Sequence, residues 1–149
     1  MQVVFGLTHT DLEIVWGSKR PTASEKGYPK IFDSMSYWVL YDGSKPVGYT
    51  SHLQIEDVVL VGNTYIRKEY RGQGLHSYLL SQRNNSSLLE GLTKITVLNP
   101  IEDSELNNLI SVVSKLGYKK VEKITDISAE VSDDLFMQLR ESGKQIWSC

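Results

Sequence analysis

The stretch from Ile66 to Leu80 constrains the fold of this chain more than any other. It reads I-R-K-E-Y-R-G-Q-G-L-H-S-Y-L-L, so an apolar, β-rich run is followed by a turn with two glycines and then by an amphipathic helix. In such a layout, free main-chain N–H groups and the positive end of the helix dipole point to one place. The stretch therefore predicts a binding site for an anion, most simply a phosphate or a diphosphate.

Length and composition indicate a single globular domain over residues 1–149. A chain of this length buries a sizeable core without help from disulfides or metal. Its hydrophobic content of 40% and charged content of 23% are ordinary for such a domain. Cys149 is the only cysteine, which excludes an internal disulfide and a cysteine-based zinc site. We expect no metal.

Hydropathy and net charge limit the kinds of partner that we expect for this chain. No run approaches the roughly 18 apolar residues of a membrane span, and the N-terminus lacks a signal-peptide layout, so we expect a cytoplasmic protein and no membrane partner. The formal net charge of −2 gives no global attraction to nucleic acid. Nucleic acid is therefore not the expected partner, although Arg67, Lys68 and Arg71 leave a local basic patch.

The pattern along the chain predicts alternating strands and helices. In the first half we expect a strand at residues 1–7, a helix after the capping box Thr10-x-x-Glu13, an irregular cleft loop at 17–34, and strands at 37–41, 47–55 and 58–66, with a bulge at Gly62-Asn63. Val47 and Tyr49 should share one face of their strand, opposite His52.

In the second half we expect a helix from Leu75 to about Arg83, a strand at 94–98, a helix at 106–116 ended by Gly117, a strand at 118–124, a helix at 133–141 capped by Ser132, and a strand at 144–147. Residues 136–140 are an alternative final strand. The fold class is α+β, with a mixed, largely antiparallel central sheet flanked by helices. An edge strand at 144–147 would allow pairing between subunits, which leaves a homodimer open.

Two motifs in this order resemble a known family. Arg71-Gly72-Gln73-Gly74-Leu75-His76 resembles the Arg/Gln-x-x-Gly-x-Gly/Ala loop of the GNAT N-acetyltransferase superfamily, and Ser114-Lys115-Leu116-Gly117-Tyr118 resembles that family's Lys-Leu-Gly-Phe helix ending. Ile66 and the pair Leu79-Leu80 also match the family pattern. The likeness spans residues 37–124. It implies a GNAT-like fold, with splayed strands around an acyl-CoA.

The resemblance also implies a cofactor site. Acetyl-CoA, or another acyl-CoA, would be the co-substrate, bound by Ile66, Arg71, Gly72, Gln73, Gly74, Leu75 and His76, with Asn107 or its neighbour Asn108 contacting the pantetheine arm. The main chain of Ile66 would pair with that arm and its N–H would stabilise the oxyanion. Arg71 either adds charge beside the phosphates or braces the loop.

The chain departs from the family pattern at three places, the last two of which concern the proton-transfer groups. His76 stands where the family prefers Gly or Ala, Val113 stands where a tyrosine often serves as general acid, and residues 58–66 contain no acidic side chain. Glu56 and His52 are the candidate catalytic residues. Their simpler interpretations are a turn residue and an exposed side chain, and His76 is more simply a packed or solvated helix-start residue than an acid–base catalyst.

The resulting hypothesis is an acyl-CoA-dependent N-acyltransferase, most simply an acetyltransferase, in which an amine attacks the thioester directly. The acceptor amine is not defined by the sequence. The first alternative is a GNAT fold that binds acyl-CoA without turnover and serves as an interaction module. The second is a GNAT-fold enzyme that modifies a nucleobase.

Overall fold

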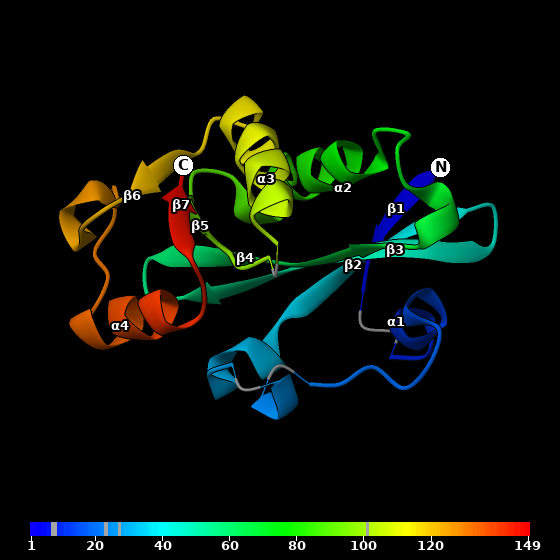
Figure 1. The fold of residues 1–149 in the computed structure, drawn as a ribbon, viewed down its shortest axis with the longest axis horizontal. Helices are drawn as coiled ribbons and strands as arrows, with labels where there is room; N and C mark the ends of the chain where they lie inside the picture. The colour runs from blue at the N-terminus through cyan, green and yellow to red at the C-terminus, as the bar shows by residue number, and fades with distance from the viewer. Residues whose placement is uncertain (7–8, 23, 27, 101) are drawn as a thin grey trace. The chain divides into compact units, whose positions relative to one another are not determined.

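The computed structural model describes residues 1–6, 9–22, 24–26, 28–100 and 102–149. Its helices and strands are β1 (Gln2–Phe5), α1 (His9–Trp16), β2 (Ser36–Asp42), β3 (Lys45–Ile55), β4 (Val58–Ile66), α2 (Leu75–Asn84), β5 (Thr93–Leu98), α3 (Asp103–Lys115), β6 (Lys119–Val121), α4 (Asp133–Glu141) and β7 (Gln145–Ser148) (Figure 1). Neighbouring strands follow the order β1-β2-β3-β4-β5-β7-β6. The predicted α+β class with a mixed sheet is confirmed.

The chain divides into two compact units. The first unit holds residues 1–53 and 62–90, and the second holds residues 54–61 and 91–149. Both units therefore take part of β3 and part of β4. Short 3-10 turns lie at Ser24–Lys26, Lys30–Ser34, Lys68–Tyr70, Ser87–Leu89 and Ile124–Asp126.

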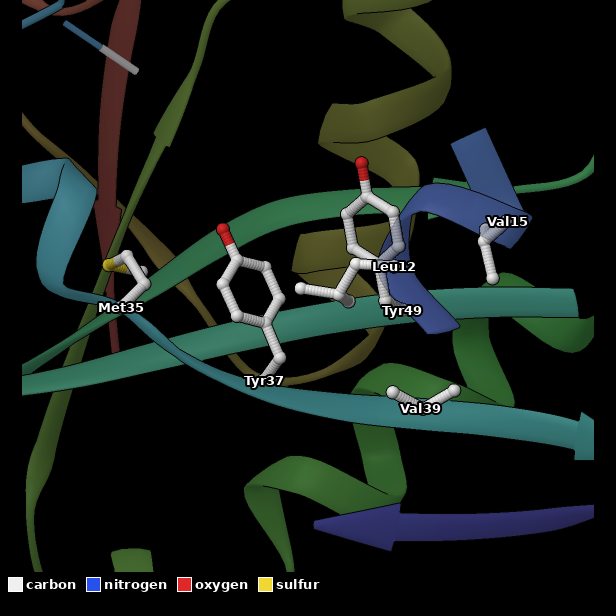
Figure 2. Packing of buried hydrophobic residues seen from close by; sticks show 6 residues of the cluster. All are labelled: Leu12, Val15, Met35, Tyr37, Val39 and Tyr49. Carbon is white, nitrogen blue, oxygen red and sulfur yellow. The ribbon is translucent and has the colours of Figure 1, made fainter. Parts of the chain in front are cut away.

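In the first unit, β2 pairs antiparallel with both β1 and β3, and α1 and α2 lie on opposite faces of these strands (Figure 1). The face toward α1 carries a buried cluster (Figure 2), made of Leu12, Val15, Met35, Tyr37, Val39 and Tyr49. Tyr37 and Val39, its members on β2, are two residues apart, as the pleat requires for side chains on one face. Strands β2 and β3 are joined by a tight turn in which Gly43 has a left-handed φ of 61°.

The opposite face of the first unit holds a second buried cluster, made of Leu40, Val47, Ile66 and Leu79. The prediction that Val47 shares a face with Tyr49 is wrong. The register of β2 and β3 shifts between Leu40 and Tyr41. Leu40 pairs with Gly48 and Tyr41 pairs with Pro46, so Val47 has no partner residue on β2. A bulge of this kind changes the direction of a side chain, so Val47 packs against α2.

In the second unit, β4 and β5 are parallel, with Val58 opposite Thr93 and Val61 opposite Thr96. Residues 58–61 are all buried, as expected for a parallel strand covered on both faces. Strand β7 pairs antiparallel with β5 and with β6. The expected edge strand at residues 144–147 is therefore an interior strand, and pairing between subunits cannot use it.

Two helices of the second unit end or begin where the sequence predicts. Gly117 has φ 90° just after α3, which is the left-handed conformation that favours glycine. Ser132 Oγ accepts a hydrogen bond of 3.1 Å from the Leu135 N–H at the start of α4. The helix at residues 133–141 is confirmed, and the alternative strand at 136–140 is wrong.

Other boundaries differ from the prediction. Helix α1 begins at His9, so Thr10 lies inside it and is not its cap. The strand expected at 118–124 is limited to β6, because the Asp126 carboxylate accepts hydrogen bonds from the N–H groups of Glu122 and Lys123 and fixes a turn there. Leu7, the end of the first expected strand, lies outside the described residues. Within the described ranges, every helix is too short or too polar to cross a membrane.

Candidate active site

The glycine loop follows β4 in the first unit. Ile66 is buried at the end of β4, and the Arg67 N–H donates to the Val47 carbonyl oxygen over 2.9 Å, which holds the strand end in the sheet. Gly72 and Gly74 have left-handed φ values of 78° and 75°, and Gly74 is the N-cap of α2. Apart from its chain neighbours, a Cβ at either glycine would meet no atom of the described residues within 4 Å. The loop therefore needs glycine for its φ angles.

The loop presents main-chain N–H groups that the chain itself does not use. Gly74 gives α2 no side-chain cap, and Tyr78 is the first residue whose N–H bonds back to the Gly74 carbonyl. In the part of the chain that the structure describes, the N–H groups of residues 72–77 have no hydrogen-bond partner. Such donors at a helix start form a site for an anion.

Arg71 braces this loop. Its Nε donates to the Ile66 carbonyl oxygen over 2.8 Å, and its guanidinium lies 5.2 Å from the centre of the Tyr65 ring. These two contacts favour the second of the roles considered for Arg71, since they fix the loop to the strand that precedes it.

A row of aromatic side chains runs from this loop across the face of the sheet that packs on α1. The ring centres of Tyr65 and Tyr49 are 6.0 Å apart, and those of Tyr49 and Tyr37 are 5.6 Å apart. In Figure 2 the Tyr37 and Tyr49 rings stand side by side with their hydroxyl groups pointing the same way. The Arg20 guanidinium closes the row, 4.7 Å from the Tyr37 ring centre. We call Tyr37, Tyr49 and Tyr65 the tyrosine row.

A cavity of about 350 Å³ opens at the Tyr37 end of this row. Its charged lining groups are Glu13, Arg20 and Asp33. Burial raises the pKa of Tyr49 to about 12, while Arg20 acts in the opposite direction, so this phenol keeps its proton at neutral pH. The sequence indicated a cleft loop at residues 17–34, but no local signal singled out Arg20.

His52 is not the exposed side chain expected from its strand pattern. Its Nδ1 accepts a hydrogen bond of 2.9 Å from Trp38 Nε1, and its ring stacks on Phe5 at 5.5 Å. Burial, and next the charge of Arg83, lower its pKa. With Nδ1 used as acceptor in the neutral ring, Nε2 carries the hydrogen, which leaves no nitrogen able to accept a proton from an amine.

Glu56 lies in the second unit, in the tight turn between β3 and β4, with φ 52°. Its carboxylate accepts hydrogen bonds of 2.7 Å from both the N–H and the Oγ of Ser132. These bonds lower the pKa of Glu56, which makes it a weaker base. The contacts describe a residue that ties this turn to the start of α4.

His76 is half-buried on α2 and, like His52, lies near Arg83. Burial, and next Arg83, lower its pKa, so it adds no positive charge to the loop at neutral pH. Arg83 itself is 2% exposed and donates from Nη1 to Thr50 Oγ1 over 2.7 Å. Asn107 and the alternative Asn108 are exposed on α3, in the second unit.

Comparison with solved structures gives many matches that span almost the whole chain. The Escherichia coli ribosomal-protein-S18-alanine N-acetyltransferase is 14% identical over 99% of this chain and 91% of its own, with a TM-score of 0.62. Diaminobutyrate acetyltransferase EctA of Paenibacillus lautus is 12% identical over 99% of this chain and 93% of its own, with a TM-score of 0.59. At such identities the likeness shows the fold alone.

Other matches are larger proteins. N-acetylglutamate synthase of Neisseria gonorrhoeae is 10% identical over 99% of this chain, with a TM-score of 0.62, and the chain spans 35% of its length. The chain also spans 36% of a Thermoplasma acidophilum structure. No curated protein sequence matches it. The model of the Acetyltransferase (GNAT) family matches residues 5–118, most of the chain, and the protein therefore belongs to the GNAT acetyltransferase family.

Proposed function

We propose that residues 1–149 form one acyltransferase domain that moves an acyl group, most simply acetyl, from acyl-CoA to an amine. The observation that carries this proposal is the set of main-chain N–H groups at residues 72–77, which have no hydrogen-bond partner among the described residues. They lie around the left-handed Gly74 at the start of α2. These groups would hold the diphosphate of the coenzyme. Membership of the GNAT family supports the choice of coenzyme.

The reaction needs no covalent intermediate with the enzyme. The lone pair of a neutral amine attacks the thioester carbonyl carbon, the tetrahedral oxyanion collapses, and the C–S bond breaks to release the CoA thiolate. The amine proton leaves to solvent or to a nearby carboxylate. Most of the rate gain would come from holding the two reactants in line, with the Ile66 N–H as a donor to the oxyanion.

The related structures support a nitrogen acceptor. The Paenibacillus enzyme is described in complex with its substrate L-2,4-diaminobutyric acid and coenzyme A. The Neisseria synthase is described with coenzyme A and N-acetyl-glutamate. Both descriptions agree with transfer to an amine, which we carry to this chain as part of the proposal.

The test compares two glycines that share a left-handed φ. Gly74→Val should weaken CoA binding by at least about 10-fold in calorimetry, because a β-branched residue at φ 75° distorts the helix start. Gly117→Val, at φ 90° after α3, imposes a comparable strain on the second unit. If both variants bind CoA with the same affinity, the diphosphate does not lie at the loop.

A second function has an observation in its favour. Val113, where the family often has a tyrosine, is a buried apolar residue. His52 Nδ1 accepts a hydrogen bond from Trp38, and the Glu56 carboxylate accepts one from Ser132. A protein that binds acyl-CoA as a sensor, without turnover, fits these facts. Release of free CoA in the presence of a broad set of amines distinguishes an enzyme from such a binding module.

A further inference from the structure

We infer that the cavity of the first unit selects an acceptor that carries a carboxylate near its amine, as a small amino acid does. The inference rests on the proposed function, because it names the acceptor class of the same site. The observation behind it is that Arg20 and Glu13, which have opposite charges, both line one cavity of about 350 Å³. A cavity of this size suits a small molecule.

Arg20 is the group that would bind the carboxylate. Arg20 is partly buried, and its guanidinium lies 4.7 Å from the Tyr37 ring centre and 5.4 Å from that of Tyr49. Among the described residues, no carboxylate lies within ion-pair distance of it. The tyrosine rings orient the planar fork, and its N–H groups match the geometry of a carboxylate.

Glu13 is the group that would bind the ammonium end. Over the described ranges its side chain has neither an ion pair nor a hydrogen bond. Asp33, by contrast, already accepts hydrogen bonds from the N–H and Oγ of Ser24, at 3.0 and 2.5 Å. The two acidic side chains also disfavour a doubly charged phosphate on the acceptor, whereas a singly charged carboxylate is repelled less.

The tyrosine row places this cavity in the same unit as the glycine loop. Arg71 contacts Tyr65 beside the loop, and the row leads through Tyr49 to Tyr37, which lines the cavity. An acceptor bound between Arg20 and Glu13 therefore lies on a continuous packed surface with the site proposed for the coenzyme.

The experiment measures CoA release from acetyl-CoA with L-α-amino acids, their carboxamides, and the amines that lack the carboxylate. The best amino acid should exceed its carboxamide in kcat/KM by at least about 10-fold, the effect of one charge-assisted pair. Arg20→Gln should reduce that ratio to about 2 or less, mainly through KM. Glu13→Gln should lower kcat/KM for every amine and leave the ratio in place.

Arg140→Gln is the matched control. Arg140 also lies over an aromatic ring, 5.4 Å from Phe136, but in the second unit, so the ratio should not change. If Arg20→Gln shows no thermal unfolding transition, Arg20→Lys is assayed instead, because lysine keeps the positive charge but lacks the planar guanidinium. The kcat/KM ratio of amino acid to carboxamide should still fall severalfold in that variant. Equal rates for amino acid and carboxamide in the wild type overturn the inference.

Calorimetry decides the case in which no acceptor is acylated. Amino acids are titrated into the protein with CoA present. Heat that appears for an amino acid but not for its carboxamide, and is lost in Arg20→Gln, supports the carboxylate site even without turnover. No heat for any amino acid up to about 10 mM overturns it. A separate titration with CoA alone reports on the proposed coenzyme loop, so the two failures are distinguishable.

Discussion

Arg71 Nε donates a hydrogen bond of 2.8 Å to the carbonyl oxygen of Ile66, the last residue of β4. The same guanidinium packs over the Tyr65 ring. One side chain therefore fixes the start of the glycine loop to both the main chain and the side-chain face of the strand that precedes it. This arrangement depends on the planar shape of arginine and its Nε–H, in addition to its charge.

Replacement of Arg71 tests whether this residue acts by fixing the loop to β4 or by its positive charge beside the phosphates. Arg71→Lys and Arg71→Met should both lower stability, by about 1 kcal/mol, because each loses the bond to the Ile66 carbonyl. Lysine should recover little of the CoA affinity lost in the methionine variant. Urea unfolding and calorimetry with CoA provide the two readouts. Full recovery by lysine would show that Arg71 acts through its charge on the phosphates.

Local patterns predicted those parts of the fold that depend on near neighbours in sequence. Ser132 and the apolar spacing after it define α4, and Gly117 defines the end of α3. The Gly62-Asn63 irregularity in β4 was also predicted, and Asn63 has φ 52°. In each case the deciding interaction lies within a few residues, so it is visible in the sequence.

Parts that depend on distant partners were not predictable. The alternation of apolar and polar residues along the strand predicts an exposed His52. It does not reveal that Trp38, on the neighbouring strand, donates a hydrogen bond to His52. Arg20 lies in an irregular loop, and only the folded chain brings it over Tyr37 and Tyr49. The glycine loop could be predicted from sequence, whereas the cavity and its charges could not, because side chains from separate segments build it.

Glu56 and Ser132 give a test of structural against catalytic roles. Glu56→Gln and Ser132→Ala should both destabilise the protein, the serine variant by about 1 kcal/mol through the lost helix cap. Neither should change kcat by more than about 2-fold. A general base behaves differently: Glu56→Gln would lower kcat by about 10²-fold or more and alter the pH profile, while Ser132→Ala would not.

Gly48→Ala should destabilise the first unit beside the candidate site. A Cβ there would lie 2.6 Å from Ile66 Cδ1 and 3.2 Å from the Tyr65 carbonyl oxygen. Overpacking of this kind typically costs about 1–3 kcal/mol. Gly6→Ala is the control, because a Cβ at Gly6 would meet no atom within 4 Å among the described residues outside its chain neighbours. Equal thermal midpoints for the two variants would contradict the packing at Gly48.

The two half-buried histidines, His52 and His76, predict loss of stability in mild acid. Burial lowers the pKa of both His52 and His76 below the usual 6.5, and Arg83 adds to the effect. At pH values below 6.5 the unfolded chain therefore binds more protons than the folded chain, so the free energy of unfolding falls as the pH falls through this range. Well above 6.5 both states hold neutral histidine and this contribution to the pH dependence vanishes.

His76→Gln should remove part of that pH dependence. Urea unfolding at about pH 7.5 and about pH 5.5 gives the loss for the wild type and for the variant. Carboxylates titrate in both proteins, so the difference between the two losses reports the histidine. His52→Asn should reduce the loss in the same way, since its Oδ1 takes the place of Nδ1 as the acceptor for Trp38 Nε1. An equal loss of unfolding free energy in the wild type and both variants would mean that the fold keeps neither imidazole neutral.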